Sequence, residues 1–130
     1  MIIKKIKYED YNGNQKETTA YFNINEVTLA KVGNELTDII NKLNETKDTD
    51  MVANLLSRII LMSYGKKSED GESFIQTKEV KEAFEYSAAF PALFMELAQD
   101  ENKFVEFVKG VIPKSIAGQL DANNLKLLNS

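Results

Sequence analysis

The first 22 residues have the alternating pattern of two β-strands around a turn. β-Branched and aromatic residues lie on both sides of residues 12–13, an Asn-Gly pair that favours a tight type I′ hairpin. With that pair as a two-residue loop, Glu9 faces Lys16 and Ile3 faces Phe22, which places an opposite-charge pair and an apolar pair sensibly. The pattern predicts an antiparallel hairpin that needs a helix or a neighbouring subunit, because an isolated hairpin is only marginally stable.

From residue 25 the hydrophobic period changes to that of a helix. We expect Asn25 to cap a helix that starts at Glu26, with an interruption at Gly33 and Asn34. After the interruption, apolar residues recur at the i, i+3, i+4, i+7 spacing of an amphipathic helix. These residues are Leu36, Ile39, Ile40 and Leu43.

The next predicted helix is the most apolar one and should be central in the fold. Thr49 or Asp50 can cap it, and Gly65 is expected to end it in the C′ position where glycine is common. Its apolar residues cover more than one stripe of the helix surface, which indicates burial on several sides. A charged loop is expected over residues 66–73, which contain the turn sequence SEDG.

Three shorter helices are predicted after residue 73. We expect Thr77 to cap the first, Ser87 to open the second and Asp100 to cap the third. Pro91 fits only in the first turn of its helix, where its missing N–H is not needed. Gly110 should close the third helix before Pro113.

Taken together, these elements predict a mainly α protein. An N-terminal β-hairpin (residues 1–22) should precede a compact bundle of five or six short helices (residues 25–110). We expect one domain over residues 1–113, because 130 residues suffice for one modest core. Residues 114–130 have a weaker pattern, interrupted by two asparagines, that fits either a weak amphipathic helix or a frayed tail.

Charge and composition exclude several classes of function. Hydrophobic residues make up 43% of the chain and charged residues 28%, as in globular proteins. Sixteen basic against twenty acidic residues give a net charge of −4, the wrong sign for binding phosphates of nucleic acid. The start of the sequence lacks the pattern of a signal peptide, and no segment approaches the roughly 20 apolar residues of a membrane span. We expect no nucleic-acid or membrane partner.

No arrangement of residues indicates catalysis or a cofactor. The sequence has no His and no Cys, which removes the commonest general base and metal ligand as well as thiolate chemistry. The acidic clusters near residues 48–50 and 69–72 lack the spacing of a calcium loop, and turn or helix-start charges explain them better. The serines lack a base, and residues 64–68 lack the upstream glycine of a phosphate loop. We therefore expect a protein that is not an enzyme.

Two groups of residues could contact a partner. Lys4, Lys5 and Lys7 lie close together on the first strand, where lysines commonly protect a strand edge from aggregation. An aromatic and Met-containing set on the later helices either belongs to the core or leaves an apolar groove for an amphipathic partner helix. The candidate apolar surface consists of Phe84, Phe90, Leu93, Phe94, Met95, Phe104 and Phe107.

Three stretches of the later part of the chain stand out together: SYGKKSEDGESF (residues 63–74), FPALFMEL (residues 90–97) and FVKGVIP (residues 107–113). In this order and spacing they resemble the tail assembly chaperones of long, non-contractile-tailed bacteriophages of Gram-positive bacteria. The resemblance spans roughly residues 21–113, and Pro91 departs from the polar residue expected there. The motif residues are Tyr64, Gly65, Ser68, Asp70, Gly71, Phe74, Gly110 and Pro113.

The resemblance implies a non-catalytic role in the cytoplasm of the infected cell. Chaperones of this family bind the long, aggregation-prone tape measure protein, keep it soluble and leave before the virion matures. In many phages a translational frameshift adds a second domain that recruits the major tail protein. Self-association is a further expectation, based on the hairpin and the many aromatic residues. Two alternatives stay open: a tail completion or connector subunit of the virion, and a small regulatory protein with a protein partner.

Overall fold

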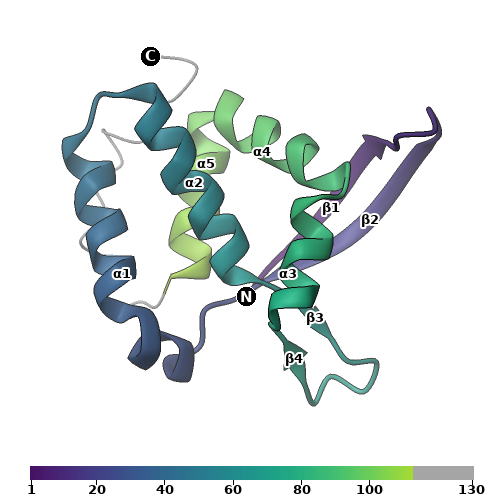
Figure 1. Cartoon of the computed structure of the whole chain (residues 1–130), viewed down its shortest axis with the longest axis horizontal. Helices are drawn as coiled ribbons and strands as arrows, with labels where there is room; N and C mark the ends of the chain where they lie inside the picture. The colour runs from purple at the N-terminus through teal and green to yellow at the C-terminus, as the bar shows by residue number, and fades with distance from the viewer. Residues whose placement is uncertain (113–130) are drawn as a thin grey trace.

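The computed structural model describes residues 1–112 and has a hairpin followed by helices (Figure 1). This confirms the predicted mainly α class with an N-terminal β-hairpin. One helix, with 20 residues, is longer than the short helices expected. In chain order the elements are β1 (Ile2–Glu9), β2 (Gln15–Phe22), α1 (Glu26–Glu45), α2 (Thr49–Ser63), β3 (Tyr64–Lys67), β4 (Phe74–Ile75), α3 (Lys78–Glu85), α4 (Ala89–Gln99) and α5 (Glu101–Val111).

The hairpin belongs to a four-stranded antiparallel sheet with the order β1-β2-β3-β4. Strands β3 and β4 form a second, shorter hairpin where the sequence predicted only a charged loop. Gly65 follows the end of α2 as expected: the helix ends at Ser63 with Tyr64 as its cap, so Gly65 is at the C′ position. It lacks the positive φ that is common at that position, because the chain continues directly into β3, where Gly65 lies opposite Tyr21 of β2.

The predicted register of the first hairpin is wrong by one residue. The Asp10 N–H donates to the Asn14 carbonyl oxygen and the Gly13 N–H to the Asp10 carbonyl oxygen, so the loop has three residues. Gly13 has a φ of 82°, as a glycine bulge after a type I turn requires. Ile2 therefore faces Phe22, and the expected pairs of Ile3 with Phe22 and of Glu9 with Lys16 do not form. The Asp10 side chain stabilises this longer loop by accepting two of its backbone N–H groups.

The predicted helix starts are confirmed where a polar side chain caps the first turn. The Asn25 side chain accepts from the Thr28 N–H, and Thr77 caps α3 in the same way. At the start of α2, Asp48 is the cap instead of Thr49 or Asp50. The predicted interruption at Gly33 is absent: α1 continues through it, since a glycine inside a helix costs only about 1 kcal/mol relative to alanine.

The last two helices follow the prediction in part. Asp100 caps α5 as expected, and Pro91 lies in the first turn of α4. Ser87 does not open α4, which starts at Ala89; its hydroxyl donates to the Phe84 carbonyl oxygen at the end of α3. Gly110 does not close α5, which continues to Val111. A methyl group on Gly110 would collide with the Ile2 side chain, so close packing on β1 explains this glycine.

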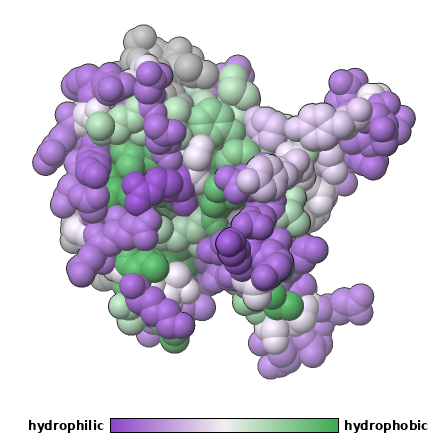
Figure 2. Space-filling model, viewed as in Figure 1, coloured by the Kyte–Doolittle hydropathy of each residue, from purple (hydrophilic) through white to green (hydrophobic). Residues whose placement is uncertain are grey.

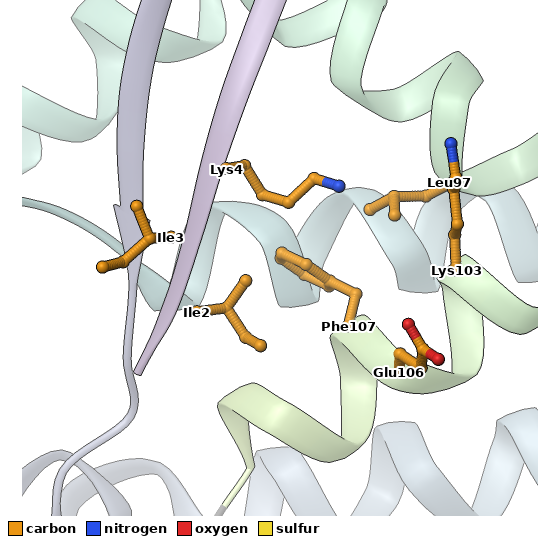
Figure 3. Close-up of a pocket in the computed structure, with 7 residues that line it drawn as sticks. All are labelled: Ile2, Ile3, Lys4, Leu97, Lys103, Glu106 and Phe107. Carbon is orange, nitrogen blue, oxygen red and sulfur yellow. The ribbon is translucent and has the colours of Figure 1, made fainter.

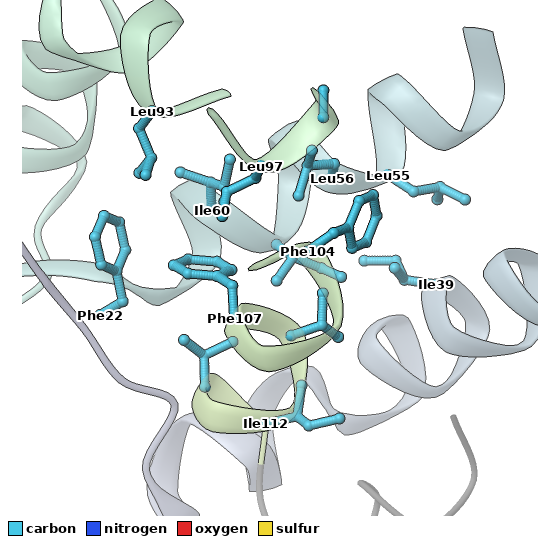
Figure 4. Close-up of a cluster of buried hydrophobic side chains, with 14 of the residues drawn as sticks. Phe22, Ile39, Leu55, Leu56, Ile60, Leu93, Leu97, Phe104, Phe107 and Ile112 are labelled. Atoms are coloured by element: carbon cyan, nitrogen blue, oxygen red, sulfur yellow. The ribbon is translucent and has the colours of Figure 1, made fainter. Parts of the chain in front are cut away.

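The core lies where the sheet meets the helices (Figure 4). Phe22 at the end of β2 is completely buried and contacts three aromatic rings edge-on, those of Tyr64, Phe84 and Phe107. The predicted apolar faces of the first two helices are buried as expected. They supply Leu36, Ile39, Ile40, Leu43, Val52, Leu55, Leu56, Ile59 and Ile60.

Candidate functional site

Two neighbouring hollows follow the outer side of β1. They have volumes of about 170 and 240 Å³ and lie beside successive parts of this strand, the first at residues 2–4 and the second at residues 5–7. Helices α4 and α5 form the opposite wall. We call this surface the edge groove and define it by residues 2–7 of β1 together with Ala92, Leu93, Glu96, Leu97, Lys103, Glu106 and Phe107.

The floor of the edge groove is apolar because α4 turns its buried face toward β1. Leu93 and Leu97 lie four residues apart on that helix, and Phe107 comes from α5. In the first hollow, Ile2 and Lys4 extend toward the helices, whereas Ile3 points away from them (Figure 3). Ile3 is 60% exposed, as expected for the outer face of a strand that alternates between helix and solvent.

One ion pair connects the two walls of the groove, and a second joins α4 to α5 within one wall. The Lys4 ammonium lies 2.7 Å from one carboxylate oxygen of Glu96, and the Lys103 ammonium lies 3.7 Å from the other. Lys5 and Lys7 are exposed and belong to none of the ion pairs found within residues 1–112. The groove thus carries four lysines against two glutamates, although the chain as a whole is acidic.

The backbone of β1 has one free side in the described part of the chain. The sheet places only β2 beside β1. Hydrogen-bonded pairs alternate along an antiparallel ladder, and Asp10 is bonded to Asn14, so the even-numbered residues of β1 are the ones bonded to β2. The N–H and C=O groups of Ile3, Lys5 and Lys7 therefore point away from β2, along the edge groove.

The predicted apolar surface does not lie together on the outside of the protein. Phe84, Leu93, Phe104 and Phe107 are at most 5% exposed and belong to the core, because short helices bury their aromatic residues to gain stability. The other three are more accessible: Phe90 and Phe94 are half-buried, and Met95 is exposed. Leu93 and Phe107 also reach the floor of the edge groove.

Most of the motif residues build the second hairpin. The Ser68 hydroxyl donates to Asp70 and accepts from the Ser73 N–H, and Gly71 has a φ of 77° in the turn. Gly65 lies against the Phe74 ring so closely that a methyl group there would come within 2.7 Å of it. The turn therefore needs these residue types for its geometry.

Tyr64 connects this hairpin to the core. Its ring stacks on Phe84 with centroids 4.1 Å apart, and burial raises the pKa of the Tyr64 hydroxyl. The stack forms the floor of a further hollow of about 180 Å³ between the first hairpin and α3. Pro113 lies outside the described residues, as does the predicted tail over residues 114–130.

Only part of the edge groove is predictable from the sequence. The lysine cluster on β1 is a local feature, but its apolar residues have no local link to it. Ala92, Glu96, Lys103 and Glu106 come from helices distant in sequence, and no local pattern shows that α4 and α5 lie beside β1. Figure 2 shows hydrophilic residues over much of the visible face, with hydrophobic residues between them.

Within residues 1–112 no group of three or more Asp or Glu side chains is placed to hold a metal ion. No helix in the same range combines the length and the apolar character needed to cross a membrane.

Comparison with known proteins identifies the family. Residues 1–126 match the family model described as phage tail assembly chaperone. No curated protein matches the chain, and no solved structure does. Because the match covers nearly the whole sequence, the chain belongs to the phage tail assembly chaperone family.

Proposed function

We propose that this protein binds the tape measure protein of its phage and keeps it soluble while the tail is assembled. Membership of the tail assembly chaperone family is the observation that carries the proposal. A tape measure protein is long and aggregation-prone before the tail forms around it, so the chaperone must cover apolar segments and later release them. Reversible binding of this kind needs a modest apolar surface with charged surroundings.

The edge groove offers such a surface. Its accessible apolar residues are the half-buried Ile2 and Ala92, which lie over the buried side chains of Leu93, Leu97 and Phe107. Lysines and glutamates line its rim. Other large apolar side chains that are exposed, such as Val27 and Tyr86, lie apart from it on α1 and after α3. The groove is therefore the strongest candidate for the contact with the client among residues 1–112.

The proposal also covers the compartment in which the protein acts and the partners that it binds. It acts without catalysis in the cytoplasm of the infected cell and is absent from the mature virion. A frameshifted longer form recruits the major tail protein, and several copies bind along one tape measure protein. Multiple binding along one long client strengthens the overall attachment without any new contact.

Co-expression tests the proposal. The tape measure protein should remain soluble and co-purify with the chaperone, and it should aggregate when expressed alone. Equal aggregation with and without this protein would refute the proposal. A matched control is the variant Val27→Ser, which changes an exposed apolar residue outside the groove and should leave the complex intact.

Mass spectrometry of purified virions separates a chaperone from a structural subunit. The free edge of β1 would also suit strand pairing between subunits of a tail completion protein, so this second function has a structural basis. A chaperone should be undetectable in virions at a level where minor tail proteins are readily found. Stoichiometric amounts in mature particles would favour the structural subunit.

A further inference from the structure

We propose that the free edge of β1 binds an extended, acidic segment of the tape measure protein, which adds to the sheet as a fifth strand. This inference rests on the proposed function, because it names the part of the client that the edge groove recognises. It specifies the conformation of the bound segment, its charge and the order of its side chains.

The first argument comes from the backbone. Ile3, Lys5 and Lys7 direct their N–H and C=O groups away from β2, and nothing in the described residues continues the sheet on this side. An edge of this length is a template for another strand. An extended peptide can pair with these groups, whereas a helix lying in the groove would leave them without backbone partners.

The second argument comes from charge. Lys5 and Lys7 are exposed, lie two residues apart and so point to the same face of the strand. Across β2, Lys5 faces Thr19, which carries no charge, while Lys7 faces Glu17. Carboxylates placed opposite these lysines on an added strand would form favourable cross-strand pairs. The acidic residues of the segment should therefore also be two positions apart.

The same lysines disfavour a second copy of this chain as the occupant. In an antiparallel pair of two β1 strands, a register centred on Lys4, Lys5 or Lys7 places that lysine opposite its own copy. A register centred on Ile6 places Lys5 opposite Lys7. Like charges directly opposite each other destabilise a strand pair. Registers centred on Ile3 or Tyr8 avoid these pairs but overlap over only about three residues of β1. The edge is thus protected against extended self-pairing but open to an acidic strand.

The third argument comes from the hollows beneath the edge. The other face of an added strand would lie over half-buried Ile2 at one end and half-buried Ala92 at the other, with the core side chains of Leu93 and Leu97 beneath them. Successive side chains of a strand alternate between its faces, so apolar residues should alternate with the carboxylates. The expected segment reads acidic-apolar-acidic-apolar, with its carboxylates on the lysine side.

Charge reversal tests the recognition by lysine. The double variant Lys5→Glu/Lys7→Glu should weaken binding of the tape measure protein about tenfold or more, because two attractive pairs become repulsive. The control Lys31→Glu/Lys42→Glu makes the same change in net charge on α1 and should weaken binding no more than about twofold. Thermal melting of each variant confirms that it is folded.

A substitution at one position tests the backbone pairing. Lys5→Pro removes an N–H on the free edge, whereas Lys5→Ala removes the same charge and keeps the N–H. The Pro variant should bind several-fold more weakly than the Ala variant. Hydrogen exchange supplies a second measurement: the amides of Ile3, Lys5 and Lys7 should become protected when the complex forms.

A set of overlapping peptides from the tape measure protein tests the expected sequence of the bound segment. The peptides with the alternating acidic-apolar pattern should bind.

The possible outcomes separate the two proposals. Binding that ignores the charge reversal and the Pro variant, with unprotected edge amides, would overturn the added strand and leave the chaperone function standing. Binding only by peptides that form amphipathic helices would do the same. Self-association that is lost in the Lys5→Pro variant would assign the edge to a second copy instead. Absence of any binding by the wild-type protein would overturn the proposed function and this inference with it.

Discussion

The two hairpins of this protein are built around similar turns but differ in size and support. Asp10 and Asp70 each accept backbone N–H groups of the turn, and Gly13 and Gly71 are the two residues of the described chain with positive φ. The strands of the first hairpin have eight residues each, whereas those of the second have four and two. Turn chemistry therefore does not decide how far a hairpin extends.

What decides the length is the surface on which the strands lie. Strand β1 rests on α4 and α5, so that Ile2 and Ile6 gain burial along most of the strand. The second hairpin is attached mainly at its base, where Gly65 packs on Phe74 and the Gln76 side chain donates to the carbonyl oxygens of Asn23 and Ser63. A strand needs a supporting face to remain ordered over its length.

The two edges of the sheet also differ, both in length and in how each is protected against pairing with another strand. The β4 edge has two residues and offers little backbone for pairing. The β1 edge has eight residues and is protected by lysines instead of by shortness. Short strands and lysines are both known means of preventing unwanted pairing, but only the lysine-protected edge still admits a partner of opposite charge.

The largest effect is expected at the residue that joins the two hairpins. Phe22 pairs with Ile2 on one side and with Tyr64 on the other, and it is fully buried. Phe22→Ala should lower the free energy of unfolding by about 3–5 kcal/mol, as expected for a large cavity. Urea denaturation measures this change. Tyr21→Ala is the control: this neighbour is only half-buried, and a loss as large as that of Phe22→Ala would contradict the central role of Phe22.

A smaller effect, confined to the second hairpin, is expected at Gly65. Gly65→Ala adds a methyl group that collides with the Phe74 ring and should cost about 1–3 kcal/mol of stability. In the double variant Gly65→Ala/Phe74→Ala the collision with the ring is relieved and only the approach to the flexible Gln76 side chain remains, so the two changes should cost less together than the sum of their separate effects. Additive effects in this double-mutant cycle would show that the close approach does not hold the second hairpin.

A still smaller effect is expected for the ion pair that attaches the first hairpin to α4. Lys4→Gln removes the pair with Glu96, whose partners are 23% and 36% exposed. Since solvent screens such pairs, the loss of stability should be below about 1 kcal/mol and should shrink at high salt. Thermal melts of both proteins at low and high salt check this. A loss comparable to that of Phe22→Ala would show that charge, rather than packing, attaches β1.

The smallest effect is expected in acid, at the two turns. The hydrogen bond from Lys16 lowers the pKa of Asp10, and that from Ser68 lowers the pKa of Asp70, both from a usual value of 3.8. A carboxyl with a lowered pKa in the folded state stabilises it above its unfolded pKa and loses that effect as the pH falls through the folded value. The turn amides Asn14 and Glu72 should therefore change in an NMR titration below pH 3.8.

Asp10→Asn separates the two turns in the acid titration. It should abolish the change at the first turn and leave that at the second, because only the first loses its ionisable group. A change at Asn14 that persists in this variant would assign it to another carboxyl.

The sequence was informative where a signal is local. Caps such as Asn25, Thr77 and Asp100 act within one turn of helix, so their residue types were enough to place the helix starts. The apolar spacing of the first two helices likewise determined which residues are buried. The absence of His and Cys restricted the chemistry in the same direct way.

The sequence failed where a residue has a role in contacts between distant segments. Two glycines that were expected to interrupt or end a helix lie inside one: Gly33 is within α1, and Gly110 is within α5, where it packs on Ile2. Gly65 does follow the end of α2, but its close approach to Phe74 has no local signal. The register slipped by one residue because an Asn-Gly pair fits both a two-residue loop and a three-residue loop, and the Asp10 side chain favours the longer one.

By itself, the sequence determined a mainly α protein with an N-terminal hairpin and a resemblance that the family match confirms. Only the tertiary structure decided which aromatic residues are buried and that, within residues 1–112, β1 keeps a free edge beside α4 and α5. The physical reason is the distance along the chain over which each kind of interaction acts. Periodicity and capping depend on residues a few positions apart, whereas the edge groove forms from segments about ninety positions apart that pack together only in the folded chain.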